Sequence, residues 1–314
     1  VLPVFSGLFM EKMVGFVKLY LPVFLLGAVF GKVIELSGFS RSIVTAVIDL
    51  VGPRRAVLSI VLVCNLLTYG GVSLFVVVFA VYPFAAEAFR LSEIPKRLIP
   101  GTIALGAFSY TMDALPGTPQ IQNIIPTTFF GTNTWAAPWL GLIGAAFILV
   151  AGVAYLDRRI ASAKARGEGY GSGHSNEPTP VSDEALAHPL VALLPLVVVG
   201  LSNLAFTALI PRLYGAKTET MLAGLDKPIV TTLSSVTAIW AVELALLAGI
   251  LTVFVFAWRP VSKSFAEGSR AAVAGSLLAA MNTASEYGFG AVIAALPGFL
   301  VIRDALSAIP NPLV

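Results

Sequence analysis

Long apolar stretches separated by short polar segments set the pattern of this chain. Each of the longest is about 20 residues or more, enough to cross roughly 30 Å of hydrocarbon as a helix; they are residues 13–35, 135–155, 188–209, 229–258 and 271–302. A shorter amphipathic segment, 40–51, is expected to lie at the interface or to complete a tilted span. Transmembrane barrel strands would alternate polar and apolar residues instead. The pattern therefore predicts an all-α polytopic membrane protein.

The apolar run 56–86 carries no charged residue and is interrupted in its middle by Tyr69, Gly70, Gly71 and Ser73. Paired glycines break a helix. The run is too long for one span and short for two, and basic residues flank both of its ends. If both flanks are cytoplasmic by the positive-inside rule, the segment enters and leaves on the same side. It is therefore predicted to be a re-entrant hairpin with its tip at 69–73.

A second interruption falls in residues 98–156, where the only charge is Asp113. Shortly after it comes the stretch Leu115-Pro116-Gly117-Thr118-Pro119-Gln120-Ile121-Gln122-Asn123. Two prolines and a glycine within four residues cannot continue an α-helix. Broken backbone at membrane depth must be buried in protein or line a wet cavity. The stretch is thus expected to be a broken helix inside the protein.

The second half of the chain is expected to contain a matching break. Residues 271–302 carry one charge inside the apolar run, Glu286, within Asn282-Thr283-Ala284-Ser285-Glu286-Tyr287-Gly288-Phe289-Gly290. Corresponding breaks in two halves point to a transporter site built from repeats. The similarity between the Tyr-Gly tips is weak in residue identity, and the helix count does not place them cleanly on opposite sides.

Residues 157–187 are the one clearly soluble stretch, with basic residues followed by Gly, Ser and Pro. This composition predicts a flexible cytoplasmic linker. It separates a first repeat half, 1–156, from a second, 188–314. The chain begins at Val1 without methionine and stops shortly after Pro312. We therefore expect a fragment that lacks an N-terminal helix and a C-terminal part.

Composition narrows the function classes. Only 12% of the 314 residues are charged and 57% are hydrophobic, about half the charge of a soluble domain. The single cysteine, Cys64, excludes an intramolecular disulfide framework. His174 and His188 both belong to the polar central region, so no metal cluster and no intramembrane catalytic set is expected. The chain is predicted to be no enzyme and to have no nucleic-acid partner; its net charge of +3 comes from basic loops and says little about nucleic acid.

Three acidic residues interrupt the apolar runs, and a charge at mid-bilayer costs a few kcal/mol, so it usually has a function or a partner. Glu243 adjoins no break and is interpreted as structural. Asp113 and Glu286 each adjoin a break and are the candidates for proton coupling. A buried hydrogen-bonding role is the alternative for both.

Broken helices also provide unpaired N–H groups and positive half-dipoles, which bind carboxylates without an arginine. No Arg or Lys lies in either polar break. Side chains beside the breaks can bond substrate hydroxyls, although they can equally cap the helix ends. The candidate substrate-binding residues are Tyr69, Gly70, Gly71, Ser73, Gly117, Thr118, Gln120, Asn123, Asn282, Thr283, Ser285 and Gly288.

The motif from Leu115 to Pro126, together with the polar segment 282–288, resembles the gluconate permease family. The resemblance covers nearly the whole chain. It implies proton symport and membership of a larger ion transporter superfamily with inverted repeats, hairpins and elevator motion. A homodimer follows only by analogy with that superfamily. The Ser-Asn-Thr tripeptide of its sodium-coupled branch is absent here, which favours protons over sodium.

The chain is therefore expected to be a secondary transporter in a bacterial inner (plasma) membrane. Driven by the proton motive force, it would take up gluconate or a similar sugar acid and would need no cofactor. Its partners would be a small organic anion and the lipid bilayer. A short hydroxy acid such as 3-hydroxybutyrate, or D-serine, is the alternative substrate. A sodium/proton antiporter of the same superfamily is the alternative class.

Overall fold

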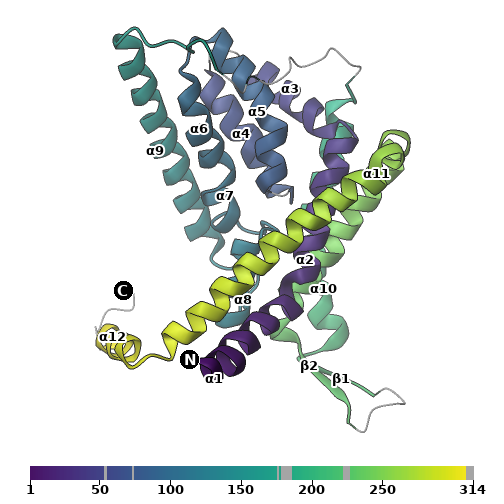
Figure 1. Ribbon diagram of the computed structural model, residues 1–314. Coiled ribbons are helices and arrows are strands. Elements are labelled where there is room, and N and C mark those ends of the chain that lie inside the picture. The colour runs from purple at the N-terminus through teal and green to yellow at the C-terminus, as the bar shows by residue number, and fades with distance from the viewer. Residues whose placement is uncertain (53–54, 73, 175–176, 178–185, 222–226, 309–314) are drawn as a thin grey trace. The chain divides into compact units, whose positions relative to one another are not determined.

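The computed structural model describes residues 1–314 apart from 53–54, 73, 175–176, 178–185, 222–226 and 309–314 (Figure 1). Nearly all regular structure in the described residues is helical. The elements are α1 (Leu2–Val4), η1 (Phe5–Phe9), α2 (Met10–Leu36), α3 (Phe39–Val51), α4 (Ala56–Tyr69), α5 (Leu74–Leu91), η3 (Lys96–Leu98), α6 (Ile99–Ala107), α7 (Tyr110–Asp113), α8 (Ile121–Phe130), α9 (Pro138–Ala165), α10 (Pro189–Tyr214), β1 (Lys217–Thr220), β2 (Ile229–Thr232), η4 (Leu233–Ser235), α11 (Thr237–Ala294) and α12 (Pro297–Ser307).

Within the described residues, four helical stretches are long and apolar enough to cross a membrane: Leu2–Leu36, Pro138–Ala165, Pro189–Tyr214 and Thr237–Ala294. This confirms the predicted all-α polytopic membrane fold. One predicted span begins too early, because residues 229–232 form strand β2, which pairs antiparallel with β1. Ile229, Val230, Thr231 and Thr232 are all β-branched, and such residues favour a strand over a helix.

The chain divides into two compact units, which are described separately. The first comprises residues 1–25 and 273–314, and the second comprises 26–272. The division cuts across the expected repeat halves, 1–156 and 188–314, so the repeat relationship stays a prediction.

The predicted hairpin lies in the second unit. Helix α4 ends at Tyr69, and α5 begins at Leu74. Between them Gly71 has a φ of +93°, a conformation that glycine adopts readily. Helix α4 has 14 residues and is therefore about 21 Å long, too short to cross roughly 30 Å of hydrocarbon.

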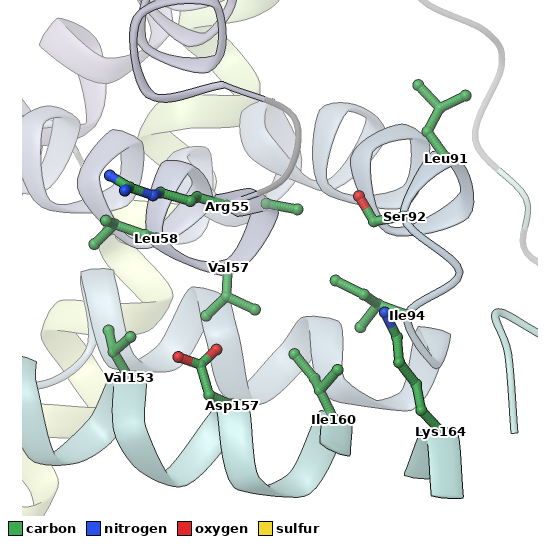
Figure 2. A pocket seen from close by; sticks show the side chains of 11 residues that line it. Arg55, Val57, Leu58, Leu91, Ser92, Ile94, Val153, Asp157, Ile160 and Lys164 are labelled. Atoms are coloured by element: carbon green, nitrogen blue, oxygen red, sulfur yellow. The ribbon is translucent and has the colours of Figure 1, made fainter.

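Both ends of this hairpin lie at the same end of α9. Arg55, just before α4, and Leu91, at the end of α5, line one cavity with Asp157 and Lys164 of α9 (Figure 2). The hairpin therefore enters and leaves at one end of the unit, and its re-entrance into a membrane stays a prediction. Helices α4, α5 and α6 pack on one another, and α6 packs on α9 (Figure 1).

The second predicted break also forms. After α6 and the short α7, the chain runs without helix through residues 114–120 and resumes as α8 at Ile121. Gly117 has a φ of +80° between the two prolines of this loop. Proline removes a backbone donor and clashes with the preceding turn, so the helix cannot pass through.

Residues 157–187 differ in part from the flexible linker that their composition predicts. Helix α9 continues to Ala165, so the first part of this stretch is helical. Arg97 donates from Nε and Nη2 to the two carboxylate oxygens of Glu168, at 2.6 and 2.8 Å. Lys96 donates to Glu177 at 2.7 Å, and Tyr170 is buried. These long-range ion pairs hold the segment on the α5–α6 connection. The local composition of residues 157–187 does not reveal them, because their partners lie far away in the sequence.

The first unit corrects the prediction of a third break. Residues 282–290 continue α11 without interruption. Thr283 and Ser285 donate their hydroxyls to the carbonyls of Ala279 and Met281, four residues earlier. Isolated glycines cost a helix only about 1 kcal/mol each, and no proline adds to that cost here.

The interruption in α11 lies elsewhere. Ala257 has non-helical φ and ψ of −135° and 36°. Pro260 follows three residues later, and a proline inside a helix removes a hydrogen bond and kinks the turn before it.

Candidate functional site

The α4–α5 turn and the 114–120 loop meet in the second unit. The Tyr69 hydroxyl donates to the carbonyl oxygen of Pro116 at 2.9 Å. Gln120 donates from Nε2 to the carbonyl oxygens of Thr68 and Val72, at 2.7 and 3.2 Å. These bonds join both predicted breaks into one structure, termed here the break junction: residues 68–72 together with 114–120.

The far side of the loop is fixed by its own amides and by Asn123. The Gly117 N–H donates to the carbonyl oxygen of Thr134 at 2.8 Å. The side chain of Asn123 donates to the carbonyls of Thr118 and Thr134, both at 3.0 Å. The broken backbone therefore has protein partners on this side, as a break away from water requires.

Intact helices pack against the junction. Asn203 of α10, fully buried, donates to the carbonyl oxygen of Gly117 at 2.9 Å. A Cβ on Gly70 would lie 2.3 Å from Leu196 of α10. A Cβ on Gly71 would lie 3.2 Å from both Pro119 and Leu246. Because Gly70 and Gly71 carry no side chains, α10, α11 and the loop can approach the tip of the hairpin.

Several buried polar atoms at and around the junction have no hydrogen-bond partner among the described residues. Thr68 and Thr118 are both 0% exposed, and neither hydroxyl is bonded. The same holds for Gln122 Oε1 and Trp135 Nε1. Buried polar groups are nearly always paired, so a set of unpaired ones marks a place where a ligand or water completes the bonding.

The electrostatics of the junction come mainly from backbone. Helix α8 starts at Ile121, and its N-cap residue Gln120 makes no side-chain capping bond because its amide is turned to α4. The first amides of α8 therefore present the positive end of a helix dipole beside the loop. Asp113 ends α7 just before the loop, is exposed, and has no partner within the described chain.

The structure brings together most of the candidate residues of the first half. Tyr69, Gly70, Gly71, Gly117, Thr118 and Gln120 form the junction, and Asn123 supports it from α8. Ser73 lies outside the described residues. Whether these residues bind a substrate stays a prediction.

The candidates of the second half belong to the first unit and are described by themselves. Asn282, Thr283, Ser285, Glu286 and Gly288 lie on the continuous helix α11 rather than at a break. Asn282 and Glu286 are exposed. Gly288 lies against Phe9, and the Tyr287 ring lies 5.5 Å from that of Phe16. No free helix end is present at this segment, so it offers no unpaired helix amides to a carboxylate.

Sequence reasoning missed the amide side chains that brace the junction. Asn203 is an example, and Asn65 of α4, hydrogen-bonded to Thr111 of α7, is another. Each is a single amide within an otherwise apolar helix. Neither side chain is charged, but a lone amide in an apolar run is as useful a signal as a buried charge. Among the described residues, no group of three His, Cys, Asp or Glu side chains is placed to hold a metal ion.

A short helical hairpin that meets a broken helix inside a polytopic bundle is typical of membrane transport proteins. The chain is 54% identical to the uncharacterized transporter YxjC of Bacillus subtilis (strain 168) over 323 aligned residues, which cover 100% of this chain and 68% of the relative. The chain belongs to the family of that transporter. No family model and no solved structure matches the chain.

Proposed function

We propose that this protein is a secondary transporter that takes up a small hydroxylated carboxylate across the bacterial inner (plasma) membrane, and that the break junction is its substrate site. The observation that carries the proposal is the meeting of two backbone breaks around buried, unpaired hydroxyls of Thr68 and Thr118. Membership of a transporter family supports transport in general.

The junction offers the chemistry that such a substrate needs. The open amides at the start of α8 suit a carboxylate, because a helix N-terminus attracts negative charge without a basic side chain. No Arg or Lys occurs between residues 98 and 134. The hydroxyls of Thr68 and Thr118 would bond a hydroxyl of the substrate, each as donor or acceptor.

Gluconate is the substrate that the resemblance to the gluconate permease family implies. A short hydroxy acid such as 3-hydroxybutyrate is the second candidate, and one observation favours it. The amides of Gln120 and Asn123 and the hydroxyl of Tyr69 already donate to backbone carbonyls. Few long side chains therefore remain to bond the five hydroxyls of gluconate.

Transport would follow alternating access, in which the elements of the junction move against intact spans. Asp113 is the coupling residue we propose, because it adjoins the loop and has no partner in the described chain. Protonation would remove its charge when the loaded site moves. The Asp113→Asn variant should lose gradient-driven accumulation and keep exchange, whereas Glu243→Gln, at a half-buried acid on an uninterrupted stretch of α11, should keep both. Normal accumulation in Asp113→Asn would remove Asp113 from the proton path.

The deciding experiment uses the full-length protein in proteoliposomes with an inward proton gradient. Uptake of labelled gluconate is measured in competition with 3-hydroxybutyrate, D-serine and citrate. Gradient-dependent uptake that unlabelled gluconate blocks best supports the sugar acid, and stronger block by 3-hydroxybutyrate moves the assignment to the short acid. Ion flux that no organic anion changes would instead support a sodium/proton antiporter and overturn the proposal.

A further inference from the structure

A second site candidate lies at the opposite end of the α4–α5 hairpin from the junction. It is a cavity of about 650 Å³ between the start of α4, the end of α5 and the last turns of α9 (Figure 2). Its apolar lining includes Val57, Leu58, Leu91, Ile94, Val153 and Ile160. Charged side chains come from Arg55, Asp157 and Lys164.

These three charged side chains have no partner among the described residues. Each is exposed, and none makes a hydrogen bond or ion pair through its side chain with any described residue. The neighbouring cations behave differently, because Lys96 is paired with Glu177 and Arg97 with Glu168. The cavity therefore offers two free cations and one free carboxylate over an apolar floor.

The position of the cavity along α9 places it at the membrane boundary. Helix α9 is uncharged from Pro138 through Leu156, and Asp157, Arg158 and Arg159 follow at once. Asp157 thus marks the depth at which the span leaves the hydrocarbon. Lys164, seven residues later, lies about 10 Å further along the axis, just outside a headgroup layer roughly 5–8 Å thick, and its long side chain can reach back into that layer. Val153 and the 71%-exposed Leu91 supply the apolar side.

We propose that this cavity binds a phospholipid whose headgroup carries a phosphate and a primary ammonium, as phosphatidylethanolamine does. The Arg55 and Lys164 side chains start at opposite ends of the cavity (Figure 2), and both are long and exposed, so in the bound state they turn inward to bond the phosphate, since basic pockets between membrane helices recognise lipid phosphates. Asp157 accepts a hydrogen bond from the ammonium. The apolar lining covers the first part of an acyl chain.

The same residues argue against the other common headgroups. A purely anionic headgroup gains nothing from Asp157, because the carboxylate repels its negative charge. A quaternary ammonium such as choline cannot donate a hydrogen bond and is bound by aromatic cages, but none of the described residues that line this cavity is aromatic. Only the primary ammonium uses all three charges.

The test is lipid binding by the detergent-solubilised full-length protein, measured by native mass spectrometry. Phosphatidylethanolamine, phosphatidylglycerol and phosphatidylcholine with identical acyl chains are titrated separately. We expect phosphatidylethanolamine to bind about ten-fold more tightly than phosphatidylcholine, the size of one charge-assisted hydrogen bond. Equal affinities for these two lipids, or tighter binding of phosphatidylglycerol, would overturn the proposal.

Variants assign the effect to the cavity. Asp157→Asn should remove the preference for phosphatidylethanolamine and leave phosphatidylcholine binding unchanged. Arg55→Gln combined with Lys164→Gln should weaken all three lipids. Arg158→Gln, one residue from Asp157 but outside the lining, is the matched control and should bind as the wild type does. A preference retained in Asp157→Asn counts against the proposal, and so does competition by soluble phosphoethanolamine as strong as that by the lipid, which would assign the cavity to a free aminophosphate.

Discussion

Gln120 donates its side-chain amide to the carbonyl oxygen of Thr68 at 2.7 Å, across 52 positions of sequence. The bond reaches the last turn of α4, where backbone carbonyls have no partner within their own helix. One side chain from the broken helix thus closes the end of the re-entrant helix. The two breaks therefore form one structural feature. Substitutions where they meet are expected to change protein stability and transport to different extents.

The first prediction concerns Gln120 itself. Gln120→Ala removes side-chain donors from the carbonyls of Thr68 and Val72. The Thr68 carbonyl keeps the Gly71 amide at 3.0 Å, but the buried Val72 carbonyl loses the Gln120 donor, which costs about 1–3 kcal/mol. Thermal unfolding of the solubilised protein should therefore occur at a lower temperature. Gln122→Ala is the matched control, because its side-chain oxygen has no partner among the described residues, and it should unfold closer to the wild type. Equal losses in both variants would contradict the role of the Gln120 bonds.

The second prediction concerns Thr118. Thr118→Val keeps the shape of the side chain and removes a buried hydroxyl that has no partner. Stability should be unchanged or raised by up to about 1 kcal/mol, while the apparent affinity for the transported anion falls. Thr118→Ser should keep that affinity. As a control, Thr127→Val loses the 2.7 Å bond to Ile124, so it should be slightly less stable with normal affinity. If Thr118→Val transports normally, its hydroxyl does not bind substrate.

A third prediction tests the support that α10 gives to the loop. Asn203→Ala leaves the Gly117 carbonyl without its 2.9 Å donor. Because the group is buried, we expect a loss of about 1–3 kcal/mol in the free energy of unfolding. Uptake should also slow, since the loop loses its anchor. Ser202→Ala, at the preceding residue, should change neither. An Asn203→Ala protein that unfolds and transports as the wild type does would show that α10 does not position the loop.

A fourth prediction follows from the pairing of Glu168 with Arg97. The hydrogen bond from Arg97 lowers the pKa of Glu168 below its ordinary value of 4.5. The pairing is thus at full strength above about pH 4.5 and is lost as the pH falls through the lowered pKa. The protection of the backbone amides around Glu168 against hydrogen exchange, taken relative to the intrinsic exchange rate at each pH, should therefore fall at that point.

Glu168→Gln should show the faster exchange already at neutral pH, because the neutral amide cannot form the ion pair. Arg158→Gln carries no partner of Glu168 and should exchange as the wild type does. A Glu168→Gln protein with unchanged exchange would mean that Tyr170 and Lys96, rather than Arg97, hold the segment.

The two breaks of the second unit were predictable because their causes are local. Gly70 and Gly71 at one site, and Pro116, Gly117 and Pro119 at the other, interrupt a helix whatever surrounds them. The predicted break at 282–290 was wrong because polar residues and isolated glycines remain compatible with a helix. The kink before Pro260 had a local cause and was nevertheless overlooked.

By itself, the sequence determined the membrane-spanning class and the two helix breaks at Gly70–Gly71 and at Pro116–Pro119, because apolar length and backbone chemistry act over a few neighbouring residues. Only the tertiary structure decided that the two breaks meet, that Asn203 holds Gly117 across 86 positions, and that Glu168 docks on Arg97. Such contacts depend on which buried groups lack a local partner and on which distant element can reach them. The packing of the helices determines which distant groups pair, and the residue pattern along the chain does not predict it.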